Sequence, residues 1–238
     1  MKKAIIIGAS AGIGKALAQV LASDGYQLGL TARRYDLLLA LQQELGQQTL
    51  IKQMDVSKTE DAIRQFSTLI EEMGGVNIVI ISAGIGFINP ELDWQKEHDT
   101  IAVNVTGFAA IANAAIHFFE QQGSGHLVNI SSIAALHGNG SAPAYNASKA
   151  FESNYMSGLR QKIIKRGLPI TITDIQPGFV DTAMAQGENL FWVASPQKAA
   201  QQIYSAIQKK KSRATITRRW IFFAWLMKLL PDFVHDRL

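Results

Sequence analysis

The 238-residue sequence has no cysteine, and this absence excludes disulfides, thiolate zinc sites and thiol nucleophiles. It fits a reducing compartment. The five histidines do not supply a metal site either, because none of them has the i,i+4 or H-x₃₋₅-H spacing that places two imidazoles on one ion. We therefore expect no metal centre. The histidines are His98, His117, His126, His137 and His235.

A long apolar segment is also missing from the start of the chain. Lys2 and Lys3 precede an apolar run that extends only from Ala4 to Ile7 before glycines interrupt it. A secretory signal needs about 7–15 continuous apolar residues, so we expect a cytoplasmic chain that begins with a buried strand. With 47% hydrophobic and 18% charged residues, disorder and collagen-like repeats are excluded, and one large core is expected.

The net charge of +4 is distributed unevenly. Residues 209–238 contain eight Lys or Arg and two Asp or Glu, which gives +6, and residues 1–208 therefore carry −2. An acidic body argues against a nucleic-acid-binding face, so no nucleic-acid partner is expected.

Short β-branched runs alternate with helical patterns along most of the chain, which is typical of β-α-β units on a parallel sheet. We predict a single α/β Rossmann-like, doubly wound domain at 1–217, with a seven-stranded parallel sheet and helices on both faces, followed by a tail at 218–238. The predicted strands are Ala4–Gly8, Gln27–Thr31, Thr49–Asp55, Val76–Ser82, Gly125–Ser131, Ile170–Gln176 and Ala214–Thr217. The predicted helices are Ile13–Ser23, Tyr35–Leu45, Thr59–Met73, Trp94–Gln121, Tyr145–Arg166 and Pro196–Lys209. Ser57 and Glu60 have the spacing of a capping box before the third helix.

A glycine-rich loop follows the first strand. It contains Gly8, Gly12 and Gly14, with Ser10 and Ile13 between them. Glycines allow a tight turn and a close backbone approach to a ligand, and the following helix N-terminus favours a phosphate. The loop is not a P-loop, since that motif would need glycine at position 9 and a hydroxyl at position 16. A tight turn alone is the alternative, but a first strand followed by a helix favours dinucleotide binding.

The second strand ends in Arg33 and Arg34, with no carboxylate to bind the ribose 2′-hydroxyl of NAD. Guanidinium groups match a 2′-phosphate, so the cofactor expected here is NADP(H). Two solvated charges are the alternative, which is weakened because cations are disfavoured at a helix N-terminus.

Ser132 follows the fifth strand, and Tyr145 and Lys149 lie four residues apart on the next helix, so they share one face. An ammonium group and a cationic nicotinamide both favour the phenolate form of a tyrosine, which gives an acid matched to a carbonyl oxygen that receives hydride. Ser132 can hydrogen-bond the same oxygen. Taken singly, each residue could be structural: a strand-end hydroxyl, a core-edge aromatic and a solvated charge.

Together with the glycine loop, this set resembles the short-chain dehydrogenase/reductase family from about Lys3 to Thr217. The resemblance implies that Tyr145 donates the proton, Ser132 orients the carbonyl, and Lys149 binds ribose hydroxyls and favours the phenolate. Asn104 would complete a proton relay through water. The remaining residues that the resemblance places at the cofactor are Asp55 and Val56 near adenine, Ala83 and Gly84 after the fourth strand, and Pro177, Gly178, Val180 and Thr182 near the nicotinamide.

The chain departs from the family pattern at two places. Ile81-Ser82-Ala83-Gly84 stands where the family usually has Asn-Asn-Ala-Gly, so we expect a local change in packing. After Thr217, the chain continues into Arg218-Arg219-Trp220 in place of the family's common short glycine-rich end.

Apolar residues flank the predicted pocket and favour a lipophilic carbonyl or alcohol, although ordinary packing is the alternative. They are Ile85, Phe87, Ile88, Ala134, Ala135, Leu136, Leu190, Phe191 and Trp192. Family resemblance also suggests a homodimer or homotetramer through the helices at 94–121 and 145–166.

The tail contains an unbroken apolar run from Trp220 to Met227, flanked by basic residues. A membrane-spanning helix needs about 20 apolar residues, so this run is too short. It suits either burial against the body or a partner subunit, or a peripheral position at an anionic membrane.

These patterns predict an NADP(H)-dependent oxidoreductase that interconverts a carbonyl and a secondary alcohol, with an oxoacyl compound or a lipophilic ketone as substrate. The alternative is a catalytically weak NADP(H)-binding sensor or scaffold.

Overall fold

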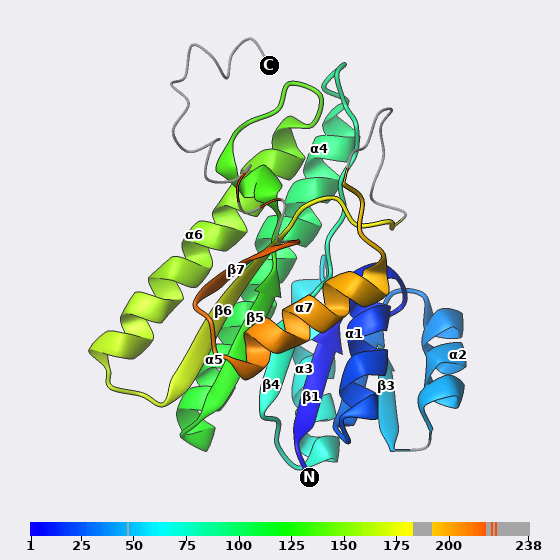
Figure 1. Ribbon diagram of the computed structural model, residues 1–238, viewed down its shortest axis with the longest axis vertical. Helices are drawn as coiled ribbons and strands as arrows, with labels where there is room; N and C mark the ends of the chain where they lie inside the picture. Colours follow the sequence, from blue (N-terminus) through cyan, green and yellow to red (C-terminus); the bar gives the residue numbers. More distant parts are fainter. Residues whose placement is uncertain (47, 183–191, 218–219, 221, 223–238) are drawn as a thin grey trace.

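The computed structural model describes residues 1–46, 48–182, 192–217, 220 and 222. Its centre is a seven-stranded parallel sheet with the order β3-β2-β1-β4-β5-β6-β7 (Figure 1), as the alternating pattern predicts. The strands are β1 (Lys3–Ile7), β2 (Gln27–Ala32), β3 (Thr49–Gln53), β4 (Ile78–Ile81), β5 (Gly125–Ile130), β6 (Ile170–Pro177) and β7 (Arg213–Ile216).

The sheet order reverses beside β1. This strand pairs with β2 on one side, where Ile6 is opposite Leu30, and with β4 on the other, where Ile6 is opposite Ile80. Ligands of open α/β sheets bind at the carboxyl ends of the strands beside such a reversal. The loops after β1, β4 and β5 are therefore the parts of the chain in which a site is expected.

Helices cover both faces of the sheet and bury alternate residues of each strand (Figure 1). On one face, α1 (Gly12–Ser23), α2 (Tyr35–Leu45) and α7 (Pro196–Gln208) pack over Ala4 and Ile6. On the other, α3 (Thr59–Met73), α5 (Phe108–Gln122) and α6 (Pro143–Lys165) pack over Ile5 and Ile7. Burial on both faces explains why the strands are almost wholly apolar.

The predicted single helix from Trp94 to Gln121 consists of three segments. These are α4 (Trp94–Ile101), a π-helical segment η1 (Ala102–Gly107) and α5, which ends at Gln122. A π-helical turn inserts an extra residue and often marks a functional site, and this one contains Asn104. The stretch Trp94–Gln122 is long and apolar enough to cross a membrane by composition, but many of its apolar side chains in α5, such as Ile111 and Phe119, are buried in the core.

Smaller differences concern the ends of elements. The third strand ends at Gln53 rather than Asp55, the fourth is Ile78–Ile81 rather than Val76–Ser82, and α6 begins two residues before Tyr145, at Pro143. The predicted capping box does not form. Lys58 is the N-cap residue of α3 and makes no side-chain cap, and Ser57 instead donates its hydroxyl to Asp55 Oδ1 at 2.7 Å. The carboxylate two residues upstream competes successfully for this hydroxyl.

Of the predicted tail, the structure describes only Trp220 and Phe222. The Trp220 side chain is buried, 1% exposed, and its ring contacts those of Phe179 and Trp192 edge-on. The rest of the tail prediction lies outside the described residues. The apolar run thus makes at least one contact with the body of the protein.

Candidate active site

The loop between β1 and α1 is built around backbone contacts that exclude side chains. Gly8 has φ +91°, and a β-carbon there would lie 2.5 Å from Ala83 N in the loop after β4. Gly12 has φ +56°, and a β-carbon at Gly14 would lie 2.1 Å from Gly8 O. The turn brings the first residues of α1 to the carboxyl ends of β1 and β4, where their free N–H groups suit a phosphate.

The same loop lies close to the segment after β6. A β-carbon on Gly12 would be 3.0 Å from Thr182 Cγ2, so the glycine loop and the predicted nicotinamide segment are neighbours in space. Val180 is held by a parallel bridge to Ala194, and Asp181 N donates to Ala194 O at 2.9 Å. Pro177 ends β6, and the ring of Trp220 fills the space that a side chain at Gly178 would need.

Arg33 and Arg34 are exposed immediately after β2. Arg34 Nη2 donates to Ser10 Oγ at 3.2 Å, which places one guanidinium against the glycine loop. Arg33 O accepts from Gln53 Nε2 at 2.9 Å, which ties its backbone to β3. Arg34 thus borders the glycine loop, and Arg33 is exposed next to it in the chain.

Asp55 and Val56 follow β3 at the same edge of the sheet. Asp55 Oδ1 accepts from the backbone N–H of Ser57 at 3.0 Å. Val56 is buried, and a β-carbon on Gly107 would be 2.6 Å from Val56 O. The close packing fixes this loop against η1.

Tyr145 and Lys149 lie on one face of α6, four residues apart, with the Lys149 ammonium 6.0 Å from the centroid of the tyrosine ring. Ser132 caps the 3₁₀ segment η2 (Ile133–Leu136) after β5, and its Oγ accepts from Ala134 N at 3.1 Å. Asn146, next to Tyr145, donates to Ala134 O at 3.2 Å and to His137 O at 2.8 Å. These bonds hold the start of α6 against the segment that carries Ser132.

Asn104 connects the π-helical segment to both the β4 loop and α6. Its Oδ1 accepts from Ile85 N at 2.9 Å, and its Nδ2 donates to Ile85 O at 2.7 Å and to Ser148 Oγ at 3.0 Å. Ser148 Oγ in turn donates to Tyr145 O at 2.7 Å. The side chain is fully buried and its orientation is determined by these contacts. The predicted relay residue is therefore placed beside the helix that carries tyrosine and lysine.

Glycines after β4 bring the backbone against the predicted catalytic side chains. A β-carbon on Gly84 would lie 3.2 Å from Lys149 Nζ and 3.4 Å from Asn104 Oδ1. One on Gly86 would lie 2.6 Å from Tyr145 Cδ2. Tyr145, Lys149 and Asn104 therefore surround one short stretch of backbone, and Ala83 joins it to the glycine loop.

Lys149 has a buried carboxylate as its partner, which the sequence analysis did not identify. Its Nζ donates to Glu152 Oε1 at 2.8 Å, to Oε2 at 3.1 Å and to Ile130 O at 3.3 Å. Asn129 Nδ2 donates to Glu152 Oε2 at 3.0 Å. The i,i+3 spacing on a helix was the available signal, but spacing alone does not reveal burial.

The electrostatics of this pair follow from burial. The lysine side chain is 4% exposed and the glutamate 1%. Burial by itself would lower the pKa of Lys149, but Glu152, with a smaller contribution from Tyr145, outweighs it and raises the pKa above its ordinary value. Burial raises the pKa of Glu152, against the opposing effects of Lys149 and Asn129. The lysine therefore stays protonated in its buried position.

A second buried carboxylate, Asp174 on β6, lies in the adjacent polar cluster. It accepts from Ser131 Oγ at 2.7 Å, from Ser153 Oγ at 2.8 Å and from Gln176 Nε2 at 3.1 Å. Arg213 Nε is 3.8 Å from its Oδ2. These hydrogen bonds satisfy the carboxylate without involving Lys149, so Asp174 has a structural part in joining α6 to the sheet.

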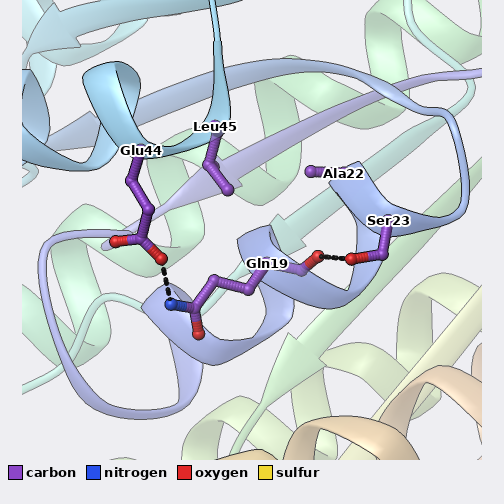
Figure 2. A pocket seen from close by; sticks show the side chains of 5 residues that line it. All are labelled: Gln19, Ala22, Ser23, Glu44 and Leu45. Carbon is purple, nitrogen blue, oxygen red and sulfur yellow. Dashed lines mark hydrogen bonds between the residues drawn. The ribbon is translucent and has the colours of Figure 1, made fainter.

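A separate surface hollow lies between α1 and α2 and is lined by Gln19, Ala22, Ser23, Glu44 and Leu45 (Figure 2). Its volume is about 390 Å³, and it is open to solvent. Gln19 Nε2 donates to Glu44 Oε1, which lowers the pKa of that carboxyl. None of the predicted site residues line it.

Part of the predicted substrate wall lies in the described chain. Ile85, Phe87, Ala134, Ala135 and Leu136 are half-buried, and Ile88 is exposed. Trp192 is exposed, while Leu190 and Phe191 lie outside the described residues. Within the part of the chain that the structure describes, no group of three or more His, Asp or Glu side chains is arranged to hold a metal ion.

Comparison with known proteins agrees with this geometry. The chain matches the short chain dehydrogenase family over residues 2–191. It is 35% identical to a protein of Myxococcus xanthus described as an uncharacterized oxidoreductase, covering 99% of this chain and 95% of that protein. It is 32% identical to an uncharacterized oxidoreductase of Mycobacterium tuberculosis, covering 96% of this chain and 92% of the other.

Solved structures share the fold. A short chain dehydrogenase/reductase from Burkholderia phymatum in complex with NAD superimposes with a TM-score of 0.85 at 22% identity, covering 94% of this chain and 92% of that one. A serine dehydrogenase complexed with NADP⁺ gives a TM-score of 0.81 at 22% identity, covering 90% and 94%. Proteins of this fold therefore bind either form of the dinucleotide.

Proposed function

Because the chain belongs to the short-chain dehydrogenase/reductase family of oxidoreductases, we propose that it transfers hydride between NADP(H) and a carbonyl or secondary alcohol. The observation that carries the proposal is the arrangement of Tyr145, Lys149 and Asn104 around Gly84 and Gly86. The nicotinamide, when bound, supplies or accepts the hydride. The chain supplies the proton and the polar contacts that the oxygen needs.

In the reducing direction, the Tyr145 hydroxyl donates a proton to the carbonyl oxygen as hydride reaches the carbon. Ser132 donates a hydrogen bond to the same oxygen and orients it. The charge of Lys149 stabilises the phenolate that remains after proton transfer. Asn104 keeps the α6 backbone at Tyr145 and Ser148 in register with the β4 loop, and a water beside it would return the proton to the tyrosine.

The two arginines after β2 support NADP(H) over NAD(H). Arg34 reaches the glycine loop at Ser10, and Arg33 precedes it in the chain with an exposed side chain. A guanidinium binds a phosphate through parallel N–H donors, whereas it offers no specific match to a ribose hydroxyl. The preference rests on this chemistry, because proteins with the same fold use either cofactor.

The substrate class is proposed from the walls of the site. Ile85, Phe87 and Leu136 are apolar and half-buried, and they lie in the segments that carry Gly86 and Ser132. Such walls favour a lipophilic ketone or an oxoacyl compound, and the reverse reaction would take the matching secondary alcohol.

The experiment is to follow the nicotinamide absorbance of NADPH with a panel of lipophilic ketones and oxoacyl thioesters, comparing the wild type with Tyr145→Phe. Turnover by the wild type that is lost in the variant supports the proposal. Tight NADPH binding without turnover on any substrate would instead favour a cofactor-binding sensor or scaffold.

Assembly and placement in the cell are part of the same proposal. The exposed apolar side chains of Trp94, Ile101 and Phe151 on α4 and α6 suit a homodimer or homotetramer, which sedimentation would reveal. We place the protein in the cytoplasm. The tail packs on the body or on a partner subunit, with a peripheral membrane position as the alternative.

The alternative for the tail is tested with anionic vesicles. Membrane contact predicts that the protein pellets with the vesicles and that truncation after Thr217 abolishes pelleting. Equal recovery of both proteins in the supernatant would exclude it.

A further inference from the structure

The buried pair of Lys149 and Glu152 carries an inference about the catalytic lysine. The three donors of the ammonium group have three acceptors within reach, of which two are the oxygens of Glu152 and the third is Ile130 O. Asn129 on β5 holds the carboxylate from the other side. The glutamate is therefore the main contact of a lysine that also lies against Gly84.

A carboxylate in this position changes the charge that the lysine can keep. A buried lysine without a counter-ion loses its proton easily, with a pKa lowered by up to about 3–5 units. A buried ion pair often adds little to stability, since the cost of removing both charges from water offsets their attraction. A functional requirement for the charge on Lys149 explains such a pair better than stability does.

Other charged groups reach this pair from neighbouring elements. Tyr145 on α6 interacts with Lys149, and Asp174 on β6 interacts with both members of the pair. Arg213 on β7 is the cation next to Asp174. Asn129 on β5 contributes a neutral amide. Among these groups in the described chain, Glu152 is the one that is hydrogen-bonded to the ammonium of Lys149. Its effect on the protonation of Lys149 should therefore be the largest.

We propose that Glu152 is a positioning residue that keeps Lys149 charged and holds its ammonium group at the floor of the cofactor site. The proposal rests on the proposed function in that the charge of Lys149 serves Tyr145. Glu152 acts through Lys149 and touches neither substrate nor cofactor. Removal of the Glu152 charge should therefore lower activity mainly at high pH, where Lys149 loses its proton, and should have a smaller effect on activity at low pH.

Glu152→Gln is the most direct variant because it keeps the shape and removes the charge. The amide oxygen can still accept from Lys149. If the Asn129 side chain rotates its amide, the new N–H₂ group can donate to Asn129 Oδ1. Glu152→Asp keeps the charge with a shorter reach and serves as the conservative variant.

The first measurement needs neither substrate nor cofactor. Protein labelled with ¹³C-lysine is titrated by NMR, and the Lys149 Cε signal is identified by its absence in Lys149→Met. In Glu152→Gln this signal should titrate at least about one pH unit below its wild-type position, because burial is no longer opposed. Glu152→Asp should titrate between the two. An unchanged titration in Glu152→Gln would overturn the proposal.

The second measurement is the pH profile of kcat/KM. Glu152→Gln should remain within about threefold of the wild type near pH 6 and lose clearly more near pH 10, because a one-unit fall in the pKa of Lys149 lowers its charged fraction by up to tenfold once the pH exceeds both pKa values. Equal loss at both values would indicate a structural role and would overturn the proposal. The control is Glu120→Gln, since Glu120 pairs with Arg166 and Lys162 at the far end of α6.

A double variant keeps the proposal testable if Glu152→Gln does not fold. Glu152→Met leaves an unpaired buried lysine, whereas Lys149→Met with Glu152→Met leaves no charge. Greater stability of the double variant than of Glu152→Met supports direct coupling of the two charges. Equal stability would overturn it. Because neither the NMR titration nor this cycle depends on turnover, failure of the proposed reaction would not be mistaken for failure of this inference.

Discussion

A β-carbon on Gly14 would lie 2.1 Å from the carbonyl oxygen of Gly8, which is too close for any side chain to fit. The two residues belong to opposite ends of the same loop, and Gly8 itself approaches Ala83 in the loop after β4. The contact is between backbone groups, so relief of the clash must move the loop. The position of the α1 N-terminus therefore depends on the absence of a side chain at Gly14.

Gly14→Ala should weaken NADPH binding by about tenfold or more, because displaced N–H groups lose their alignment with the phosphates, and should destabilise the fold by about 1–3 kcal/mol through overpacking. NADPH binding is measured by fluorescence and unfolding by denaturant. The control is Gly158→Ala, an exposed helical position where a β-carbon meets nothing within 4 Å. It should leave binding unchanged and stabilise the helix by about 0.5–1 kcal/mol. Equal effects of the two variants on NADPH binding would contradict the assignment of the glycine loop as the phosphate-binding site.

Tyr145→Phe should lower kcat by about 10²–10⁴-fold, the range for loss of a positioned general acid, while NADPH binding stays within a few fold of the wild type. The ring keeps its packing against Gly86, so the fold should not change. Steady-state kinetics and a binding titration test the two parts separately. Tyr155→Phe is the matched control, since that ring stacks on Phe151 away from the site. A Tyr145→Phe enzyme with near wild-type kcat would remove Tyr145 from its role.

Arg34→Ala should reduce the preference for NADPH over NADH by about tenfold or more, because a charge-assisted hydrogen bond to a phosphate contributes roughly 1.5–3 kcal/mol. Arg33→Ala should act in the same direction, and the double variant should bind both cofactors similarly. The ratio of kcat/KM for the two cofactors is the measurement. Arg64→Ala, which removes an exposed cation paired with Asp61 on α3, should leave the ratio unchanged. If neither single variant changes it, the arginines do not select the cofactor.

Apolar strands, glycines and helical spacing were sufficient to predict the sheet and its helices, and the spacing of Tyr145 and Lys149 placed them on one helix face, whereas Asn104 was expected only from the family resemblance. The strands, the helices and the shared helix face each depend on residues that are close together in the sequence. The interruption of the helix from Trp94 to Gln122 was not predicted, because the π-helical turn at Asn104 depends on contacts with Ile85 and Ser148 that come from other parts of the chain.

Glu152 was missed for a related reason. Three residues from Lys149, it resembles an ordinary surface ion pair of a helix, and only the packing of α6 on β5 buries both charges against Asn129. Burial changes a weak surface contact into a determinant of charge. The predicted capping box at Ser57 was wrong because of a local contact: the nearby carboxylate of Asp55 accepts the hydroxyl hydrogen bond that the pattern assigns to the helix.

His126 makes the stability of the fold depend on pH. Its ring is buried on β5, and its Nε2 is 2.8 Å from Thr173 Oγ1, which itself donates to Lys211 O at 2.6 Å. The hydroxyl hydrogen is therefore used, and the neutral imidazole donates from Nε2. Burial, with a smaller effect from Lys210, lowers the pKa of His126 from 6.5 to about 4.

A lowered pKa means that the unfolded chain binds a proton between pH 6.5 and about 4 while the folded chain does not. Stability contributed by the neutral ring is thus present above pH 6.5 and is lost as the pH falls, by about 2 kcal/mol at pH 5. His126→Gln, whose amide can donate to Thr173 as the imidazole does, should be less stable at pH 7 but should lose about 2 kcal/mol less between pH 7 and pH 5. Urea unfolding of both proteins at the two values measures the difference. Parallel losses in the two proteins would show that His126 does not control this part of the acid sensitivity.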